Sequence, residues 1–409
     1  MLQGKHIVLG ISGGIAAYKI PELIRLLIKQ GAEVKVTTTA HALEFVTPLT
    51  LQTLSGHKVY SNVFAAINEH STEHISLPEW ADCMLIAPAT ANVLSKCAYG
   101  IADDALTTTF SAMRKPVIIA PAMNDKMYAS EPTQEAMHTL AAREHIHMLD
   151  CDSGFLACGS MGKGRMQDIL PILDAVEYAL TPHDMAAHKF LLTAGPTQEK
   201  IDPVRFVSNY STGKMGFELA RECYMHGADV DIVAGPVQYS WQPPIFYPTD
   251  NHRLPTYTIH SVISADQMLQ QAIALWPFAT TAVLAAAVAD FAPNATAEYK
   301  IKREKDDLIL RLRPTADIAA TLGKTKSGHQ HLVGFALETH DERTHAKDKM
   351  ERKNFDLIIL NSLQDSGAGF GYDTNKVTLF FRQGEEKNYP LLSKRAVAQV
   401  IADAIVSLH

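Results

Sequence analysis

Two patterns of hydrophobic and polar residues alternate along the chain. Short apolar runs, rich in Val and Ile, have the length of buried strands, and longer amphipathic stretches between them have the spacing of helices. Strands followed in turn by helices are typical of parallel sheets that are covered by helices. The pattern therefore predicts an α/β protein.

In the first half of the chain, strands are expected at 5–11, 32–39, 83–89 and 116–122. Helices are expected at 14–30, 91–95, 132–144 and 168–180. Pro21 falls inside the first of these helices, so we expect that helix to kink or restart there.

The second half repeats the pattern after a polar, turn-rich stretch, "TPHDMAAH". Strands are expected at 189–199, 228–235, 282–290, 331–338, 356–361 and 376–381, and helices at 214–226, 265–276, in the stretch that ends at Lys353, and at the C-terminus. Segments 299–304 and 308–313 alternate with period two about residues 305–307, which predicts a hairpin with Lys300 and Lys302 on one face. The pattern predicts two Rossmann-like or flavodoxin-like domains with mainly parallel sheets, at 1–181 and 188–409, joined by a linker at 182–187.

Composition narrows the class of protein. A chain of 409 residues, 47% hydrophobic and 20% charged, fits a soluble protein with more than one core. The net charge of -7 gives no broad attraction to nucleic acid or to an anionic membrane. Five cysteines with no C-x-x-C pair fit reduced thiols, and the N-terminal apolar run resembles a strand more than a signal peptide. We therefore expect a cytoplasmic protein that binds neither nucleic acid nor membrane.

Small and polar residues follow the predicted strands of the first half. Ser12, Gly13 and Gly14 form a turn that presents backbone N–H groups to a phosphate, and their spacing favours a mononucleotide over a dinucleotide. A glycine turn without a ligand is the alternative. Pro88 to Asn92 suit a flat ring that lies against backbone. The candidate cofactor residues are Ser12, Gly13, Gly14, Ile15, Thr37, Thr38, Pro88, Ala89, Thr90, Ala91 and Asn92, and Met123 and Asn124 follow the next strand as further candidate site residues.

The stretch "ACGSMGKGRM" places Cys158 ahead of three glycines. It lacks the spacing of a Walker phosphate loop, because Arg165 and Met166 follow Gly164. From these residues alone, Cys158 could be a nucleophile, a proton donor, a metal ligand or a buried thiol. His74 is equally open, since a histidine among polar residues is commonly only solvated.

The second half carries an anion-binding pattern of another kind. "SNYSTGKMG" offers Asn209, Ser211 and Gly213 ahead of a helix, which suits an anion without Walker spacing. An ordinary capped helix is the alternative. Asp290 ends a predicted strand, and Lys349 and Lys353 lie four residues apart on one helical face. Lys300 and Lys302, facing the Asp290 carboxylate, are candidates for binding a triphosphate, and two merely solvated lysines are the alternative.

The motifs "GISGGIAAYK", "HISLPEWAD", "APATAN", "PAMN" and "ACGSMGKGRM" together resemble the flavin-dependent cysteine decarboxylases. More closely, the whole chain resembles the bacterial bifunctional phosphopantothenoylcysteine decarboxylase/phosphopantothenate–cysteine ligase family of coenzyme A synthesis. This resemblance implies FMN as the cofactor of the first domain. It also implies that Cys158 donates a proton from a mobile flap, that Asn124 binds the substrate carboxylate and that His74 assists at the flavin.

For the second domain, the resemblance implies ligation of L-cysteine to 4'-phosphopantothenate through an acyl-cytidylate made from CTP. Lys300 then stabilises the phosphates, and Asn209 holds the phosphopantothenoyl part. The implied nucleotide residues are Leu284, Ala285, Ala286, Asp290, Lys300, Ala316, Asp317, Ile318, Ala319, Phe335, Lys349 and Lys353. Ala316 replaces the proline usual in the family, which puts the rigidity of this loop in question.

The resemblance also implies Mg²⁺, held mainly by nucleotide phosphates with Asp290 as the candidate protein ligand. It implies a homo-oligomer, with trimers of decarboxylase domains building dodecamers and ligase domains pairing as dimers. Two alternatives to this function are a flavin-binding regulatory module and a peptidyl-cysteine decarboxylase. Neither of them needs Lys300 or Asn209.

Overall fold

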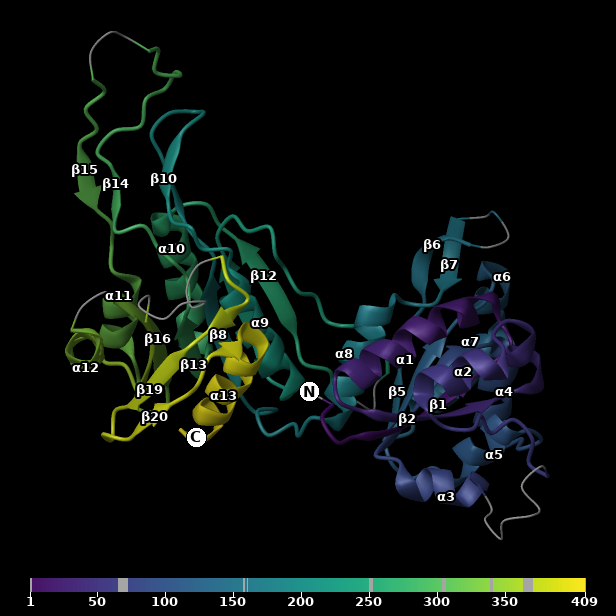
Figure 1. Cartoon of the computed structure of the whole chain (residues 1–409). Helices are drawn as coiled ribbons and strands as arrows, with labels where there is room; N and C mark the ends of the chain where they lie inside the picture. Colours follow the sequence, from purple (N-terminus) through teal and green to yellow (C-terminus); the bar gives the residue numbers. More distant parts are fainter. Residues whose placement is uncertain are drawn as a thin grey trace. The chain divides into compact units, whose positions relative to one another are not determined.

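The structure is a computed structural model, and it describes residues 2–64, 73–156, 159, 161–249, 253–303, 307–338, 341–362 and 371–408 (Figure 1). The chain divides into two compact units. Unit 1 comprises Met1–Thr181 and Pro243–Arg253, and unit 2 comprises Pro182–Gln242 and Leu254–His409. The polypeptide therefore passes between the units at three points.

Unit 1 is built on a parallel sheet with the strand order β2-β1-β3-β4-β5. Its strands are β1 (His6–Ile11), β2 (Glu33–Thr38), β3 (Cys83–Ala89), β4 (Val117–Pro121) and β5 (Ile146–Met148), and β6 (Asp152–Phe155) pairs with β7 (Met161–Arg165) in a separate antiparallel ribbon. The helical segments are η1 (Ile15–Lys19), α1 (Ile20–Lys29), η2 (Ala40–Glu44), α2 (Pro48–Ser55), α3 (Glu73–Trp80), α4 (Ala91–Tyr99), α5 (Ala105–Ala112), α6 (Asp125–Ala129), α7 (Glu131–Ala141) and α8 (Ile169–Leu180). This strand order is the flavodoxin-like one, and its connections reverse direction between β1 and β3.

The sheet of unit 1 is buried on both faces. Leu9 and Leu85 pack with α1 and α8 in one apolar cluster, whereas their neighbours Val8 and Ile86 pack with α4, α5 and α7 in another. Successive side chains of a strand point to opposite faces, so a strand buried on both sides is apolar throughout. This explains why the continuous apolar runs, and not alternating ones, mark the strands in the sequence.

A segment of the second half completes the edge of this sheet. Phe246 forms an antiparallel bridge with Leu149, and the N–H of Tyr247 donates to the carbonyl of Met148 at 2.8 Å. The hydroxyl of Tyr247 donates to Oε1 of Gln134 at 3.1 Å. We call residues 243–249 the edge segment. It covers the exposed side of β5, although in the sequence it lies within the range expected for the second domain.

Unit 2 is built on a larger sheet with the strand order β12-β11-β8-β13-β16-β17-β19-β20. The strands are β8 (Lys189–Ala194), β11 (Asp229–Ala234), β12 (Tyr257–Ser261), β13 (Thr281–Leu284), β16 (His331–Glu338), β17 (Leu357–Ser362), β19 (Val377–Phe381) and β20 (Glu386–Asn388), with the short pairs β9 (Gln198–Lys200) and β10 (Phe206–Ser208), β14 (Phe291–Pro293) and β15 (Leu312–Pro314), and β18 (Thr374–Asn375) and β21 (Leu392–Ser393). The helical segments are α9 (Lys214–Met225), α10 (Ala265–Leu275), η3 (Trp276–Phe278), α11 (Ile318–Thr325), α12 (Glu342–Lys353) and α13 (Lys394–Val406). The six parallel strands from β12 to β17 have the Rossmann order, which reverses direction between β8 and β13.

Most of the predicted elements are present at the expected positions. The expected restart at Pro21 is also confirmed, because α1 begins at Ile20 after the 3-10 turn Ile15–Lys19. The α/β class with mainly parallel sheets is confirmed in both units.

The predicted hairpin at 299–304 and 308–313 is wrong. β15 pairs instead with β14, and the N–H of Asn294 donates to the carbonyl of Arg311. The backbone of Ile301 is engaged elsewhere, since its N–H donates to Asp202 Oδ2 and its carbonyl accepts from Arg205. Lys300 and Lys302 therefore do not share a strand face, because neither lies in a strand. In Figure 1, β14 and β15 project away from the main sheet of unit 2.

Candidate functional site

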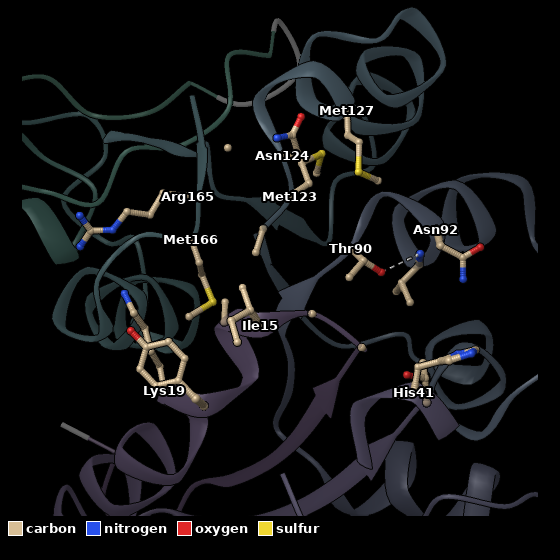
Figure 2. Close-up of a pocket in the computed structure, with 18 of the residues that line it drawn as sticks. Ile15, Lys19, His41, Thr90, Asn92, Met123, Asn124, Met127, Arg165 and Met166 are labelled. Atoms are coloured by element: carbon tan, nitrogen blue, oxygen red, sulfur yellow. Dashed lines mark hydrogen bonds between the residues drawn. The ribbon is translucent and has the colours of Figure 1, made fainter. Parts of the chain in front are cut away.

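Unit 1 has a cavity of about 990 Å³ at the carboxyl ends of β1, β3 and β4. This is the point where the strand order reverses, and there neighbouring loops diverge and leave room for a ligand. Figure 2 shows side chains from several loops around the cavity, with Met123, Asn124 and Met127 on one side and Ile15 on another. Of the predicted residues, those that line the cavity are Gly13, Gly14, Ile15, Thr90, Asn92, Met123 and Asn124.

Ser12 supports this cavity from behind. Its hydroxyl donates to the carbonyl of Pro88 at 2.7 Å and accepts from the N–H of Thr90 at 3.0 Å. Ser12 is fully buried, so this side chain ties the end of β1 to the end of β3 and does not line the cavity. Pro88, Ala89 and Ala91, next to the cavity residues Thr90 and Asn92 in the sequence, likewise do not line the cavity.

Gly13 lies where a side chain has no room. A Cβ at this position would come within 2.4 Å of the Cβ of His41. At Gly14, a Cβ would meet only the Cγ2 of Thr90, at 3.3 Å. The turn after β1 therefore needs a glycine at position 13 to pass beside His41, which also lines the cavity.

Buried hydroxyl groups without a hydrogen-bond partner lie at the carboxyl end of β2 and directly after it. Among the described residues, the Oγ1 atoms of Thr37, Thr38 and Thr39 have none. Thr39 lines the cavity, whereas Thr37 and Thr38 do not. An unpaired buried hydroxyl is costly, so the Oγ1 of Thr39 suits a polar ligand atom.

The antiparallel ribbon β6–β7 borders the same cavity through Phe155 and Gly164. The N–H of Met123 donates to the carbonyl of Gly164 at 2.9 Å, and a Cβ on Gly164 would lie 2.5 Å from the carbonyl of Met123. The ribbon is thus fixed against the loop that carries Asn124. Cys158, which belongs to the connection between β6 and β7, lies outside the described residues.

Asp150 anchors the base of this ribbon. Its buried carboxylate accepts from Tyr128 Oη at 2.7 Å, from the N–H of Cys151 at 2.8 Å and from Lys163 Nζ at 2.6 Å. Burial opposes the charge of Lys163, but the hydrogen bond to Asp150 outweighs it and raises the pKa of Lys163. The Lys163 ammonium therefore stays charged at neutral pH.

Gln167 connects this base to the edge segment. Its buried amide donates to the carbonyls of Asp150 and Ile245 and accepts from the N–H of Ile245. The N–H of Asp150 also donates to the carbonyl of Ile245, at 2.8 Å. Sequence patterns gave no signal for this contact, because a glutamine before a helix is normally exposed.

The two predicted catalytic residues His74 and Asn124 differ in their position relative to the cavity. His74 lies in α3 and does not line the cavity, and its Nδ1 is buried without a partner among the described residues. Asn124 lines the cavity and caps α6, where its Oδ1 accepts from the N–H of Lys126 at 2.9 Å. The catalytic roles expected of both residues stay predictions.

Unit 2 has a second cavity, of about 680 Å³, at the carboxyl ends of β8 and β13. It too lies where the strand order reverses. The predicted residues that line it are Asn209, Ser211, Gly213, Leu284, Ala285, Ala286, Asp290, Ala316, Asp317, Ile318, Ala319, Phe335, Lys349 and Lys353. Lys300 is exposed and does not line this cavity.

Asp317 organises one side of the second cavity. Its side chain caps α11 by accepting from the N–H of Ala320 at 3.0 Å, and it pairs with Lys353 at 2.9 Å. Burial alone would raise the pKa of Asp317, but the backbone hydrogen bond and the Lys353 ammonium together lower it. The carboxylate is therefore ionised at neutral pH.

Thr315 fixes the loop that contains Ala316. The N–H of Thr315 donates to the carbonyl of Asp290 at 2.9 Å, and the hydroxyl of Thr315 donates to the carbonyl of Ala289 at 2.6 Å. Nearby, Nδ2 of Asn209 donates to the carbonyl of Ala287 at 2.8 Å. These bonds join the loops after β10, β13 and β15 into one wall.

The polar residues of the second cavity that were not among the predicted site residues include Asn361, Asn375, Lys214 and Lys394. Lys394 is only 5% exposed although it is the first residue of a helix. A lysine at such a position is normally solvated, so composition and periodicity gave no signal for it.

The described part of the chain holds no group of three or more His, Cys, Asp or Glu side chains arranged for a metal ion. In the same residues, no helix combines the length and the apolar character that crossing a membrane requires.

Comparison with known proteins gives matches over both units. The family model of the flavoproteins matches residues 1–181, and that of the DNA/pantothenate metabolism flavoprotein C-terminal domain matches residues 185–408. The chain is 40% identical to the coenzyme A biosynthesis bifunctional protein CoaBC of Bacillus subtilis, over 100% of this chain and 98% of the relative. It is 41% identical to the protein of the same name from Vibrio cholerae, over 99% and 98% of the two chains. It is 39% identical to the Escherichia coli protein of that name, over 100% and 98%.

Proposed function

Because the chain belongs to the family of coenzyme A biosynthesis bifunctional proteins, it is a lyase and a ligase in one polypeptide, and we propose which cavity performs which reaction. Unit 2 joins L-cysteine to 4'-phosphopantothenate with CTP. Unit 1 then decarboxylates the resulting 4'-phosphopantothenoylcysteine with FMN. The observation that supports this assignment is the presence of two chemically different cavities, each at the strand reversal of its own sheet.

The residues of the first cavity fit a flavin mononucleotide. The glycine turn at Gly13 leaves space for a ligand beside His41, and the unpaired hydroxyl of Thr39 awaits a polar atom. The turn from Gly13 to Ile15 then binds the phosphate, with the N–H groups of Gly13 and Ile15 as donors while that of Gly14 donates to the carbonyl of Ser12. Thr90 and Asn92 contact the ring. When bound, the flavin supplies the two-electron oxidation and later reduction that removing CO2 from a cysteine amide requires.

The protein itself orients the substrate and supplies a proton. Asn124, at the end of β4, donates from its amide to the substrate carboxylate until CO2 leaves. Cys158 donates the proton that completes the product, from the connection of a ribbon whose base borders this cavity. His74 assists at the flavin from a neighbouring subunit, because it does not line the cavity of its own chain.

The residues of the second cavity fit a nucleoside triphosphate that activates a carboxylate. The 4'-phosphopantothenate carboxylate attacks the α-phosphate of CTP and releases pyrophosphate, and the amine of cysteine then displaces CMP from the acyl-cytidylate. Lys349 and Lys353 supply positive charge to the phosphates, and the N-terminus of α11 adds backbone N–H groups. Phe335 and the segment Leu284–Ala286 contact the nucleoside, and Asn209 holds the phosphopantothenoyl part.

Magnesium accompanies the triphosphate in this proposal. Phosphate oxygens and water supply most of its ligands, and Asp290 is the cavity carboxylate that can supply another. This arrangement needs no preformed cluster of protein ligands.

We further propose a cytoplasmic homo-oligomer in which decarboxylase units form trimers within a dodecamer and ligase units form dimers. Exposed apolar side chains around the first cavity support a subunit contact there. Ile15 is 56% exposed, Tyr18 64% and Phe155 72%. A neighbouring subunit would cover these groups and bring His74 to the flavin.

The proposed function is tested with the purified full-length protein. We expect a yellow preparation with a flavin absorption spectrum. Starting from 4'-phosphopantothenate, it should release CO2 only when cysteine and CTP are also supplied. Supplied 4'-phosphopantothenoylcysteine should be decarboxylated without CTP. A colourless protein that does not bind added FMN would contradict the proposal. So would CO2 release that needs neither CTP-dependent ligation nor supplied 4'-phosphopantothenoylcysteine.

A further inference from the structure

The edge segment is anchored on both faces of the sheet of unit 1. Phe246 packs against the apolar cluster that contains α1 and α8, with its ring centroid 5.5 Å from that of Tyr178, whereas Tyr247 packs against the cluster that contains α4, α5 and α7. Successive side chains of an extended segment point to opposite faces, so the two rings hold the segment on either side of β5. Backbone bonds already close this edge, and the hydroxyl of Tyr247 is available for another contact.

The hydroxyl of Tyr247 begins a chain of hydrogen bonds that ends at Asn124. It donates to Oε1 of Gln134 at 3.1 Å, and Nε2 of the same amide donates to the carbonyl of Tyr128 at 2.6 Å. The N–H of Tyr128 in turn donates to the carbonyl of Asn124 at 2.9 Å, within the helix α6 that Asn124 caps. Burial and the nearby charge of Asp150 raise the pKa of Tyr247, so its hydroxyl keeps the proton that it donates.

A second chain of bonds joins the edge segment to the same tyrosine. The carbonyl of Ile245 accepts from the N–H of Asp150 at 2.8 Å, and Oδ1 of Asp150 accepts from the hydroxyl of Tyr128 at 2.7 Å. Tyr128 is thus held by its carbonyl through Gln134 and by its hydroxyl through Asp150. Both routes lead from the edge segment to α6, which begins after Asn124 at the wall of the first cavity (Figure 2).

Helix α6 needs such support because it is short and exposed. It comprises five residues, and none of them is buried. Burial of apolar surface therefore contributes little to fixing this helix, and a helix of this length is not stable by itself. The position of Asn124 then depends on how firmly Tyr128 is held. An amide that meets a carboxylate must lie within hydrogen-bond distance of it, and a displacement of about 1 Å is enough to lose the contact.

We infer that Tyr247 is a positioning residue for decarboxylation, which holds Asn124 where the substrate carboxylate binds. It acts through Gln134 and Tyr128, and it does not itself line the cavity. The inference rests on the role proposed for Asn124. It extends that role to a residue within 188–409, the range expected for the ligase domain, so a part of this range serves the reaction of unit 1.

Tyr247→Phe tests this inference, since it removes one hydroxyl and keeps the packed ring. We expect the KM for 4'-phosphopantothenoylcysteine to rise about three- to tenfold, the equivalent of one hydrogen bond. The inhibition constant of 4'-phosphopantetheine, the same molecule without the carboxylate, should change less than about twofold. The matched control is Tyr257→Phe, because the hydroxyl of Tyr257 is also buried but has no hydrogen-bond partner within the described residues. It should leave both constants unchanged.

Hydrogen exchange of the full-length protein gives a measure that does not depend on turnover. The amides of residues 124–130 should exchange faster in Tyr247→Phe than in the wild type, because the N–H of Tyr128 bonds within a helix that has lost one support. The amides of α1 should exchange at the same rate in both proteins, and Tyr257→Phe should match the wild type throughout unit 1.

Gln134→Leu is the second variant, and it should raise the same KM relative to the same inhibition constant. The hydroxyl of Tyr247 then lacks its acceptor, so adding Tyr247→Phe to Gln134→Leu should raise the KM no further. Melting temperatures show which variants are folded. A folded Tyr247→Phe or Gln134→Leu protein with the wild-type KM, or additive effects of the two replacements, would overturn the inference while the decarboxylase function stands. A wild type that does not decarboxylate supplied 4'-phosphopantothenoylcysteine would overturn the function itself.

Discussion

The two cavities of this chain occupy the same topological position but are built from different groups. The first is formed by a glycine turn, hydroxyl groups and apolar side chains such as Ile15 and Met127. The second carries four lysines, from α9, α12 and α13. Both lie where the strand order reverses, so the sheet decides where a ligand binds and the loops decide which one.

The difference follows from what each reaction asks of the protein. A flavin brings its own reactivity, so the first cavity mainly needs shape, a phosphate turn and one proton donor. Activation of a carboxylate by a triphosphate builds up negative charge, which the second cavity must stabilise with its own cations. Variants that abolish ligand binding in one cavity and leave the other cavity intact therefore test whether the two cavities work independently.

The largest effect is expected from Gly13→Val. The new side chain would collide with His41, since even a Cβ would come within 2.4 Å of it. We expect flavin content to fall more than about tenfold and decarboxylation to become undetectable, while CTP-dependent ligation continues. Absorbance of the purified protein measures the flavin. Gly14→Ala is the control, because its Cβ meets only Thr90, and it should stay yellow.

Lys300→Gln is expected to lower pyrophosphate release from CTP about 100- to 1000-fold, the cost of losing one stabilising group in a transition state. Lys300 is exposed between β14 and β15, so its role requires this segment to move to the cavity when CTP binds. A coupled phosphate assay measures the release. The control is Lys302→Gln, also exposed and two residues away, which should retain ligation. Wild-type rates in Lys300→Gln would remove this residue from the site.

Gln167→Leu tests the contact between the edge segment and the base of the β6–β7 ribbon in unit 1. It removes the amide that joins Asp150 to Ile245. The carbonyl of Asp150 and the N–H of Ile245 then lose the partner that Gln167 supplies, each at a cost of roughly 1–3 kcal/mol, whereas the carbonyl of Ile245 still accepts from the N–H of Asp150. We expect decarboxylation of supplied 4'-phosphopantothenoylcysteine to fall about tenfold, with ligation unchanged. Hydrogen exchange should show faster exchange of amides in β6 and β7. Gln52→Leu, on α2, is the control, and equal protection of the ribbon in both variants would contradict this role of the edge segment.

The smallest effect is expected for Asp317→Ala, which removes a helix cap worth about 1 kcal/mol. The melting temperature of unit 2 should fall by a few degrees. The pKa of Asp317 is lowered in the folded protein, so its contribution is complete above the unfolded pKa of about 3.9 and disappears as the pH falls through the folded pKa. Wild type and variant should therefore differ at pH 7 and converge in strong acid. A difference in melting temperature between wild type and Asp317→Ala that does not change with pH would contradict stabilisation by an ionised Asp317.

The sequence was sufficient for the local elements and less so for the contacts between distant segments. Continuous apolar runs such as 83–89 identified strands because a parallel sheet is buried on both faces. The segment 299–313 led to a wrong prediction, because period-two alternation does not show which strand is the partner. Here Leu312–Pro314 pairs with Phe291–Pro293.

Long-range contacts left no local pattern in either cavity. Thr90 and Asn92 were found because they follow a strand directly. Lys394 reaches the second cavity only through the packing of α13 beside α9, and Ile245 reaches Gln167 from 78 residues away. No window of sequence contains both partners of such a contact.

The central claim is that two independent cavities perform the two reactions. It is tested most directly by identifying the products of variants in which only one cavity is altered. Gly13→Val and Lys300→Gln would each receive 4'-phosphopantothenate, cysteine and CTP, and in a second reaction 4'-phosphopantothenoylcysteine alone, followed by mass spectrometry. We predict that Gly13→Val accumulates 4'-phosphopantothenoylcysteine, and that Lys300→Gln makes 4'-phosphopantetheine only when that compound is supplied. Loss of both products in a folded variant of either kind would contradict the account.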